Sequence, residues 1–336
     1  MSSTRSALAV VVLVPALIAL ALWAFVWPSA RLAPRDLPLG VAGPAQATAP
    51  VTAQLAERGD AFAVHTYPDA AAARTAIEER EIYGAVVATP DGPELLIASA
   101  AGPSVARLLT EAVGEQAAGG AGATARPVPT KDVVPLPAAD PRGSALNSSV
   151  LPLALAGLAL GGAATLLGLR GGRAVPVLLG GAAAIGLVAA AVADSWLGAL
   201  AGGWWTEAGA LGLTVLAGAA GVAGLAAVLG RAGMGLGSLV VMLLGNPFSG
   251  VTSAPEMLPE PVGAIGQLLP PGAGGSLVRS VAYFDGNGAA GPLAVLLTWT
   301  VAGLSLVAAG PLLAGRRRKR AEAPAADRPA GARVAA

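Results

Sequence analysis

Near its C-terminal end, the chain carries an uncharged run of more than twenty residues that leads directly into five cations. The run is Gly291–Gly315, and the cations are Arg316, Arg317, Arg318, Lys319 and Arg320. A helix of this length, rising about 1.5 Å per residue, crosses a hydrocarbon core of roughly 30 Å. Because positive flanks stay on the cytoplasmic side, the run predicts a span whose C-terminal end lies inside.

The composition is that of a membrane protein. Hydrophobic residues make up 54% of the chain and charged residues only 12%, whereas soluble domains average about 25% charged residues. The abundance of Ala, Gly and Arg with almost no Lys indicates a bacterial genome, so we expect the bacterial cell membrane.

The residue inventory argues against an enzyme. The absence of cysteine excludes disulfides, thiolate metal sites and a Cys nucleophile. Neither lysine, Lys131 or Lys319, lies in a phosphate-binding G-x-x-x-x-G-K-[ST] loop. No pattern of paired carboxylates, Ser-His-Asp or metal ligands emerges, and we expect no cofactor. His65, the only histidine, is expected to be a surface or packed residue rather than a ligand or base.

The chain begins with an expected anchor over residues 1–27. Its apolar run, Ala7–Trp27, is longer than the roughly 7–15 residues of a cleavable signal core and follows Arg5. We therefore predict an uncleaved span with its amino end inside.

Residues 28–147 have the character of a water-facing α/β domain. Ala61–Tyr67 alternates like a strand, and Tyr83–Ala88 is rich in β-branched residues. A T-P-D-G turn at Thr89–Gly92 leads into a further short strand. Helical patterns lie between these strands, one of them capped by Asp69. Following an inward-to-outward span, this domain is predicted to be extracytoplasmic.

Residues 148–315 predict five further spans, which makes six transmembrane helices with the α/β domain inserted between the first and second. Cations lie at the expected inner boundaries and are almost missing from the outer short loops. The topogenic residues are Arg170, Arg173, Arg231 and the basic run Arg316–Arg320. Both termini are therefore expected in the cytoplasm, with residues 316–336 a basic, disordered tail.

The fifth span, Gly235–Gly250, is short and is broken by Asn246-Pro247. It is followed by residues 251–290, which carry a single cation, Arg279. Here we expect two short helices, divided by a turn at Pro270–Gly272, that form a hairpin lying at the outer interface or dipping between the spans. A plain extracellular loop is the alternative.

Small residues are frequent in the later spans, for example in the G-x-x-x-G of Gly157 and Gly161. Such residues permit close helix approach, either within one bundle or along a homodimer seam. No ionisable residue lies near the middle of a span, which argues against an ion-coupled carrier.

Four short elements precede the last span: N-P-x-S within Gly245–Gly250, P-x-x-L-P at Pro255–Pro259, L-P-x-G at Leu269–Gly272 and Y-F-x-G within Val281–Gly286. Earlier in the chain come the first span and an outer α/β block that starts at Leu37–Val41 and includes the strand Ile82–Val87. This pattern, with its five clustered later spans, resembles the permease subunits of type-2 ABC exporters, and most closely their phage-infection-protein (YhgE/Pip-like) branch.

The resemblance implies a membrane subunit of an export system, paired as a dimer with a separate ATP-binding subunit. Asn246, Pro247, Phe248 and Ser249 are the candidate transport path or gate. The alternative is a cell-envelope binding or scaffold protein whose outer domain recognises a partner, which the short inner loop Arg170–Arg173 favours. Nucleic acid is not an expected partner, because the basic run directly follows a span and is better placed to contact anionic lipid.

Overall fold

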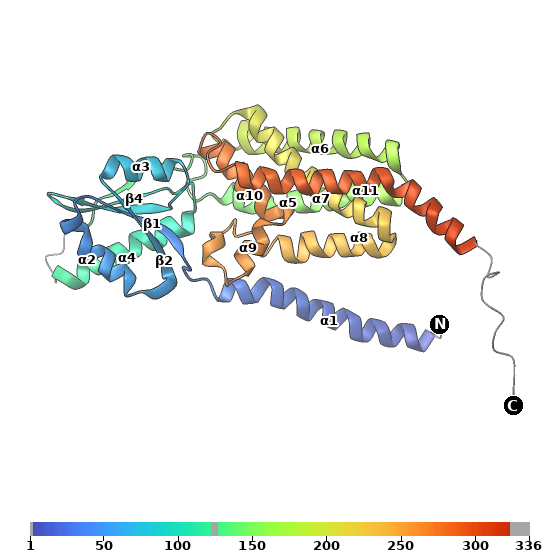
Figure 1. Ribbon diagram of the computed structural model, residues 1–336, viewed down its shortest axis with the longest axis horizontal. Coiled ribbons are helices and arrows are strands. Elements are labelled where there is room, and N and C mark those ends of the chain that lie inside the picture. The colour runs from blue at the N-terminus through green and yellow to red at the C-terminus, as the bar shows by residue number, and fades with distance from the viewer. Residues whose placement is uncertain (1–2, 122–126, 323–336) are drawn as a thin grey trace, which may run out of the picture.

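The computed structural model describes residues 3–121 and 127–322. A small α/β layer occupies one end of the elongated molecule, and long helices run side by side through the rest (Figure 1). The N-terminus of α1 and the C-terminal end of α11 lie at the end opposite the α/β layer (Figure 1). The expected combination of a helical membrane part with an α/β region is confirmed.

The α/β layer is built on a five-stranded mixed sheet in the order β2-β1-β3-β4-β5. Its strands are β1 (Leu37–Ala42), β2 (Phe62–Tyr67), β3 (Gly84–Thr89), β4 (Gly92–Ile97) and β5 (Thr130–Asp132). Three neighbour pairs are parallel, and only the β3–β4 hairpin is antiparallel. At its turn the Thr89 hydroxyl donates to the Gly92 carbonyl over 2.6 Å, as the turn sequence predicts.

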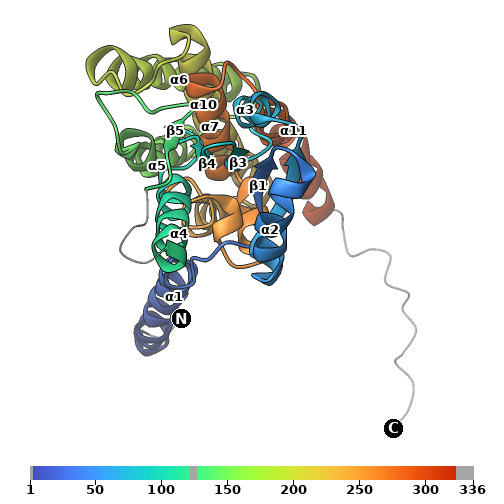
Figure 2. The same cartoon turned by 90° about the vertical axis from the view of Figure 1, so that its left-hand side faces the viewer.

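Helices cover both faces of the sheet. α3 (Ala70–Glu78) lies on one face, while α2 (Ala45–Ala56) and α4 (Pro103–Ala121) lie on the other (Figures 1 and 2). The carboxylate of Asp69 accepts the amide N–H of Ala72 over 2.9 Å and caps α3, which satisfies a donor left free at the helix start. Ala73, Ala76 and Ile77 form the buried face of α3, as their spacing predicts.

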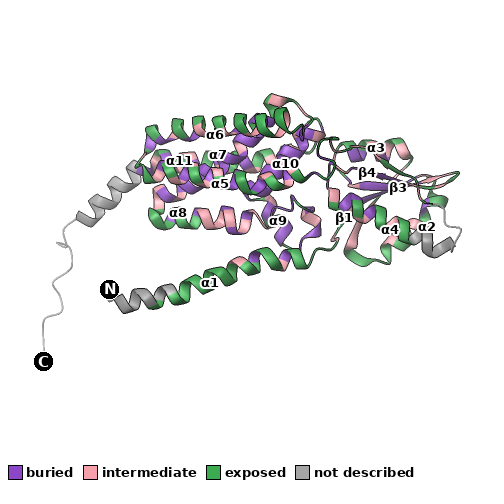
Figure 3. Cartoon of the chain, turned by 180° about the vertical axis from the view of Figure 1, so that it is seen from behind, coloured by how far each residue is buried: buried purple, intermediate pink, exposed green. Residues whose placement is uncertain are grey.

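The helical part is assembled around α7 (Trp204–Leu229). In its most apolar stretch, 72% of the α7 span is buried inside the protein, whereas the other candidate spans are only 11–28% buried. Its neighbours are α5 (Ser144–Leu166), α6 (Ala174–Ala190) and α11 (Ala290–Glu322). The burial colouring shows the buried residues concentrated between these helices (Figure 3).

Glycines let the neighbours approach α7 closely. A Cβ added at Gly161 would lie 2.5 Å from the Ala219 carbonyl oxygen, and one at Gly157 would lie 3.1 Å from that of Val215. Gly224 of α7 faces Gly303 of α11 in the same way. The Gly157–Gly161 motif therefore packs within the bundle, as the first of its two interpretations expects.

Among the described residues, five helices are long and apolar enough to cross a membrane, as expected for a multi-pass membrane protein. They are Val11–Ala30, Ser144–Leu166, Gly171–Trp196, Trp204–Leu229 and Ala290–Gly310. The third combines η3 (Gly171–Arg173), α6 and the π-helical η4 (Ala191–Trp196).

The predicted span Gly235–Gly250 differs from the structure. There, α8 (Arg231–Ser238) contributes eight residues and the π-helical η5 (Leu239–Gly245) seven. Fifteen residues extend only about 22 Å at an α-helical rise. The helix is therefore too short by itself to count as a span, and it stops just before Asn246-Pro247.

The hairpin region forms two short helices inserted between the long ones, which is one of the two expected placements, but its second helix begins earlier than predicted. It consists of η6 (Pro255–Met257), α9 (Val262–Gln267) and α10 (Pro270–Tyr283). Pro270 and Pro271 begin α10 instead of forming a turn, because a proline in the first helical turn needs no N–H donor. Most of α10 is buried against α7, α11 and α5, so this region is inserted between the helices and does not lie on their surface.

The two terminal helices are longer than predicted. α1 (Ser3–Ala30) contacts the bundle near its C-terminal end, where Ala24 packs against Leu243, Phe248 and Leu258. α11 continues through the basic run to Glu322, because no helix-breaking residue interrupts it there. The expected disordered tail 316–336 is thus helical up to residue 322, and its remainder lies outside the described residues.

The close contact at Gly161 can be tested by comparing an alanine substitution there with the same substitution at the adjacent Gly162. Gly161→Ala should lower the free energy of unfolding by roughly 1–3 kcal/mol, because the new methyl group meets the α7 backbone. Gly162→Ala has open space around its Cβ and should be neutral or stabilising by up to about 1 kcal/mol. Titration of the purified protein with SDS measures both, and equal effects would contradict this packing.

Candidate functional site

A polar cavity of about 250 Å³ lies where the α/β layer meets the inserted hairpin. Two arginines, a tyrosine, a serine, a glutamine and two glutamates line it. The α/β layer contributes Pro38, Arg80, Glu81, Ile82, Tyr83 and Ala101. The helical part contributes Pro255, Glu256, Gln267, Ser276, Arg279, Gly288 and Pro292.

Arg80 extends from the α/β layer into the helical part. It follows α3 with a left-handed φ of 63°, and its guanidinium donates to the Ser276 carbonyl over 3.1 Å and to the Ser280 hydroxyl. The guanidinium carbon also lies 5.3 Å from the ring centre of Phe284, which is within cation–π range. Burial, together with the nearby Arg279, lowers the pKa of Arg80 to about 10, so the group stays charged at neutral pH.

Arg279 belongs to α10 and is only 4% exposed. Its Nη2 donates to the Val251 carbonyl over 2.9 Å, while its Nε has no partner among the described residues. Burial lowers the pKa of this guanidinium. Within the part of the chain that the structure describes, neither Arg279 nor Arg80 has a carboxylate at ion-pair distance.

Tyr83 and Glu256 form a second polar contact across the junction. The Tyr83 hydroxyl donates to Glu256 Oε2 over 2.8 Å. Burial and the adjacent Glu256 carboxylate raise the pKa of Tyr83, which keeps the phenol protonated and able to donate. This contact engages one oxygen of the only glutamate that the hairpin places in the cavity.

Backbone contacts add to the docking of the α/β layer. The amides of Ala33 and Arg35 donate to the carbonyls of Met257 and Glu256 over 3.1 and 2.9 Å. On the other side of the junction, Asn287 Nδ2 donates to the Glu78 carbonyl over 3.1 Å. Contacts from several separate segments therefore hold the α/β layer on the hairpin.

The predicted gate, Asn246, Pro247, Phe248 and Ser249, lies beside this cavity but does not line it. Gln267 Nε2 donates to the Ser249 carbonyl over 2.7 Å, and Gln267 Oε1 accepts the Ser276 hydroxyl over 2.6 Å. Phe248 is buried in the apolar cluster that receives α1. The break is thus connected to the cavity through one glutamine side chain.

The topogenic arginines that the structure describes lie at the opposite end of the bundle. Arg170 and Arg231 line a cavity of about 310 Å³ together with Val307 and Gly310 of α11. Arg173 ends the adjoining η3. The side chains of Arg316, Arg317, Arg318, Lys319 and Arg320 lie outside the described residues.

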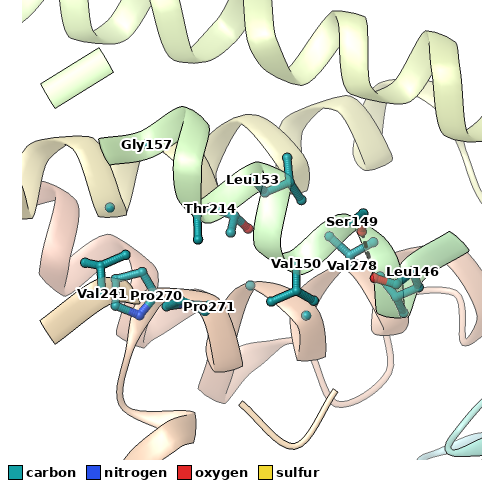
Figure 4. Close-up of a pocket in the computed structure, with 14 residues that line it drawn as sticks. Leu146, Ser149, Val150, Leu153, Gly157, Thr214, Val241, Pro270, Pro271 and Val278 are labelled. Carbon is teal, nitrogen blue, oxygen red and sulfur yellow. Dashed lines mark hydrogen bonds between the residues drawn. The ribbon is translucent and has the colours of Figure 1, made fainter. Parts of the chain in front are cut away.

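A smaller cavity inside the bundle has the character of a packing gap. It measures about 20 Å³ and lies between α5, α7, η5 and α10 (Figure 4), with room for about one water. Figure 4 shows Val241 of η5 beside Pro270 and Pro271 of α10, with Val150 of α5 lining the same cavity. The Thr214 hydroxyl bonds within its own helix to Ala210 over 2.8 Å, so nothing polar is offered to a ligand.

Two further polar residues do not join the junction cavity. Glu207 is fully buried at the start of α7, where Oε1 accepts the Gly202 amide over 2.8 Å. His65 is exposed on the edge strand β2. Among the described residues, no group of three His, Cys, Asp or Glu side chains is placed to hold a metal ion.

Reasoning from sequence missed most of the residues that line the junction cavity. Arg80 and Tyr83 appear as ordinary residues of the outer domain, and the contacts between α3 and α10 span about two hundred positions in the chain. The one available signal was Arg279, the single cation in residues 251–290. A lone arginine in an otherwise apolar helix indicates a polar environment.

No protein-family model, curated protein or solved structure matches this chain. The site is therefore defined by its own geometry: two guanidinium groups and several neutral donors between the inserted hairpin and the α/β layer.

Removing the Arg80 side chain should loosen the docking of the α/β layer. Its charged hydrogen bonds are worth about 1.5–3 kcal/mol, so Arg80→Ala should speed amide hydrogen exchange in α3 and α10 by roughly ten- to a hundredfold. Arg74→Ala, at a partly exposed position within α3, is the matched control and should leave exchange unchanged. Equal exchange in the two variants would show that Arg80 does not hold the junction.

Proposed function

We propose that this chain is the permease-like membrane component of a type-2 ABC export system. The observation that carries the proposal is the convergence of the four segments on which the family resemblance rests. Gly245 faces Pro271, Gly250 faces Pro255, and Phe284 lies beneath Arg80. Segments separated in the sequence thus form one assembly around the junction cavity, which supports a shared functional role.

The proposed topology has six spans with both termini in the cytoplasm of a bacterial cell. The fifth of these spans, α8–η5, would enter from the inner side and end at the Asn246-Pro247 break, with the chain to Gly250 completing the crossing. Supporting this orientation, Arg170 and Arg231 lie together beside the C-terminal half of α11, as the positive-inside rule requires. The α/β domain, inserted between α1 and α5, would then face outward.

A buried polar site at the outer end of a closed bundle suits an exporter. The small apolar gap in the bundle offers no open path, so movement of helices is needed for passage. The discontinuity at Asn246–Ser249 is the place for it, since backbone released from helical bonding is where transporter helices bend. An ATP-binding subunit, with the chain itself paired as a dimer, would drive this movement.

A second candidate function is recognition of an envelope partner by the outer domain. An apolar cavity of about 230 Å³ favours it, lying between α2, α4 and the sheet with Gln54 and Arg58 among its lining residues. In this case the helical part would serve as an anchor.

Single cysteines test the topology, because the chain has none of its own. His65→Cys is exposed on β2, and Gly172→Cys lies in open space within η3. An impermeant maleimide should label His65→Cys in intact spheroplasts and Gly172→Cys only after detergent is added. Labelling of Gly172→Cys from outside would reverse the orientation and remove the basis for export.

Co-expression with a candidate ATP-binding subunit tests the function. The two should co-purify, and a cross-linker on Gly172→Cys should reach the subunit because this position is at the inner end. Gly162→Cys is the matched control: it also has open space around it but lies within the span α5, out of reach of a soluble subunit. Failure to co-purify or cross-link, with a ligand still bound by the outer domain, would favour the second function.

A further inference from the structure

The junction cavity is lined by two arginines and two glutamates, and the Glu256 carboxylate offsets part of the positive charge on both arginines. Arg80 and Arg279 both line it, with no carboxylate at ion-pair distance within the described residues. Of the two glutamates in the lining, Glu81 is exposed at the mouth and Glu256 accepts the Tyr83 hydroxyl. A buried cation is costly unless an anion or dense hydrogen bonding compensates it.

The hydrogen bonding of Arg279 is incomplete. Only Nη2 has a partner, the Val251 carbonyl, and Nε has none among the described residues. The side chain is nevertheless 96% covered, since its exposed fraction is 4%. Among the described residues, the fold thus fixes a guanidinium beside the cavity with no directly bonded carboxylate and with a free Nε donor, which leaves hydrogen-bonding capacity for an anion.

The cavity lies at the level where α11 begins. Gly288 lies two residues before this helix and Pro292 belongs to its first turn, and both line the cavity. Beside the lining residues Gln267 and Pro292, the side chains of Leu268 and Leu293 are 62% and 38% exposed. A polar cavity next to exposed apolar side chains at the start of a span matches the boundary between lipid headgroups and acyl chains.

We propose that the junction cavity binds the phosphate group of an amphiphile, with Arg80 and Arg279 as its cationic ligands. Guanidinium groups are suited to phosphate because their planar donors pair with two oxygens at once. Gln267 and Ser276 add neutral hydrogen-bonding groups to the same wall. The volume of about 250 Å³ accepts a phosphate headgroup, while the acyl chains would lie outside along Leu268 and Leu293.

This inference rests on the proposed function for one step only: that the bound amphiphile is the exported substrate. Binding itself does not require an ATP-binding subunit or transport. If the co-purification experiment fails, the proposed export function is contradicted but the phosphate site is not. If phosphate binding is lost, the proposed interaction with the ATP-binding subunit is unaffected.

The test is lipid binding to the purified full chain in detergent, measured by native mass spectrometry. The probes are dioleoylphosphatidylglycerol and dioleoylglycerol, which differ in the phosphoglycerol headgroup. The wild-type chain should retain the phospholipid and release the diacylglycerol. Arg80→Gln and Arg279→Gln should each weaken phospholipid binding by about tenfold or more, whereas Arg74→Gln should bind as the wild type does.

A variant that is expected to strengthen phospholipid binding distinguishes an effect of charge from an effect of misfolding. Glu256→Gln removes a negative charge from the cavity wall and keeps an oxygen that can accept the Tyr83 hydroxyl. It should bind the phospholipid more tightly than the wild type, which a merely structural disturbance would not produce. If Arg279→Gln does not fold, Arg80→Gln and Glu256→Gln still give opposite predictions. Equal binding of both lipids, or unchanged binding in Arg80→Gln and Glu256→Gln alike, would overturn the site.

Inorganic phosphate and glycerol 3-phosphate test whether the bound phosphate belongs to a lipid headgroup or to a soluble phosphate ester. Their binding, followed by isothermal titration, should be much weaker than that of the phospholipid if the apolar flank contributes. Equal affinity with the same dependence on Arg80 would retain the phosphate site and overturn the amphiphile, assigning a soluble phosphate ester in its place.

Discussion

The helical part depends on backbone contact along α7. In lipid the surroundings are as apolar as the side chains, so helices gain little from burying leucine against leucine. What remains is dispersion between atoms that approach closely, and this requires small residues where helices cross. Gly157 and Gly161 on α5 and Gly303 on α11 meet the small residues of α7 at backbone distance. This explains why α7 is enclosed while its neighbours keep one side outward.

The inserted hairpin connects the helical bundle to the α/β layer. α10 is buried against α7 and α11, and the same helix supplies the carbonyl and hydroxyl that accept the Arg80 guanidinium. The α/β layer therefore rests on a helix that the bundle itself holds in place. Charged and neutral hydrogen bonds carry this contact, since the junction cavity between the two parts is polar. Any shift of α10 within the bundle would reach the outer layer directly.

Local signals predicted the α/β layer well. Alternation, the Asp69 cap and the T-P-D-G turn are properties of a few neighbouring residues, and the strands and helices lie where these signals place them. The helical part was harder, because hydropathy cannot tell a short inserted helix from a short span. Thus Leu239–Gly245 adopts a π-helical turn, and Pro270 starts a helix that the sequence favoured as beginning later.

The site was the least predictable part, for a reason of distance along the chain. Arg80 and Ser280 are two hundred residues apart, and nothing local to either indicates the other. The Asn246–Ser249 break was visible from sequence, but its connection to the cavity runs through Gln267, the last residue of the short helix α9. Local sequence signals therefore identified residues beside the cavity but few of the residues that line it.

The attachment of α1 has a mechanical consequence. It joins the bundle through Ala24 and its apolar partners near one end, while Val11, Leu13 and Leu17 farther along remain more than half exposed. A rod hinged at one end can change its tilt without disturbing the hinge, and tilt is the usual response of a span to bilayer thickness. Because Phe248 is part of that hinge, a change in the thickness of the surrounding bilayer would tilt α1 and so apply force to the broken helix.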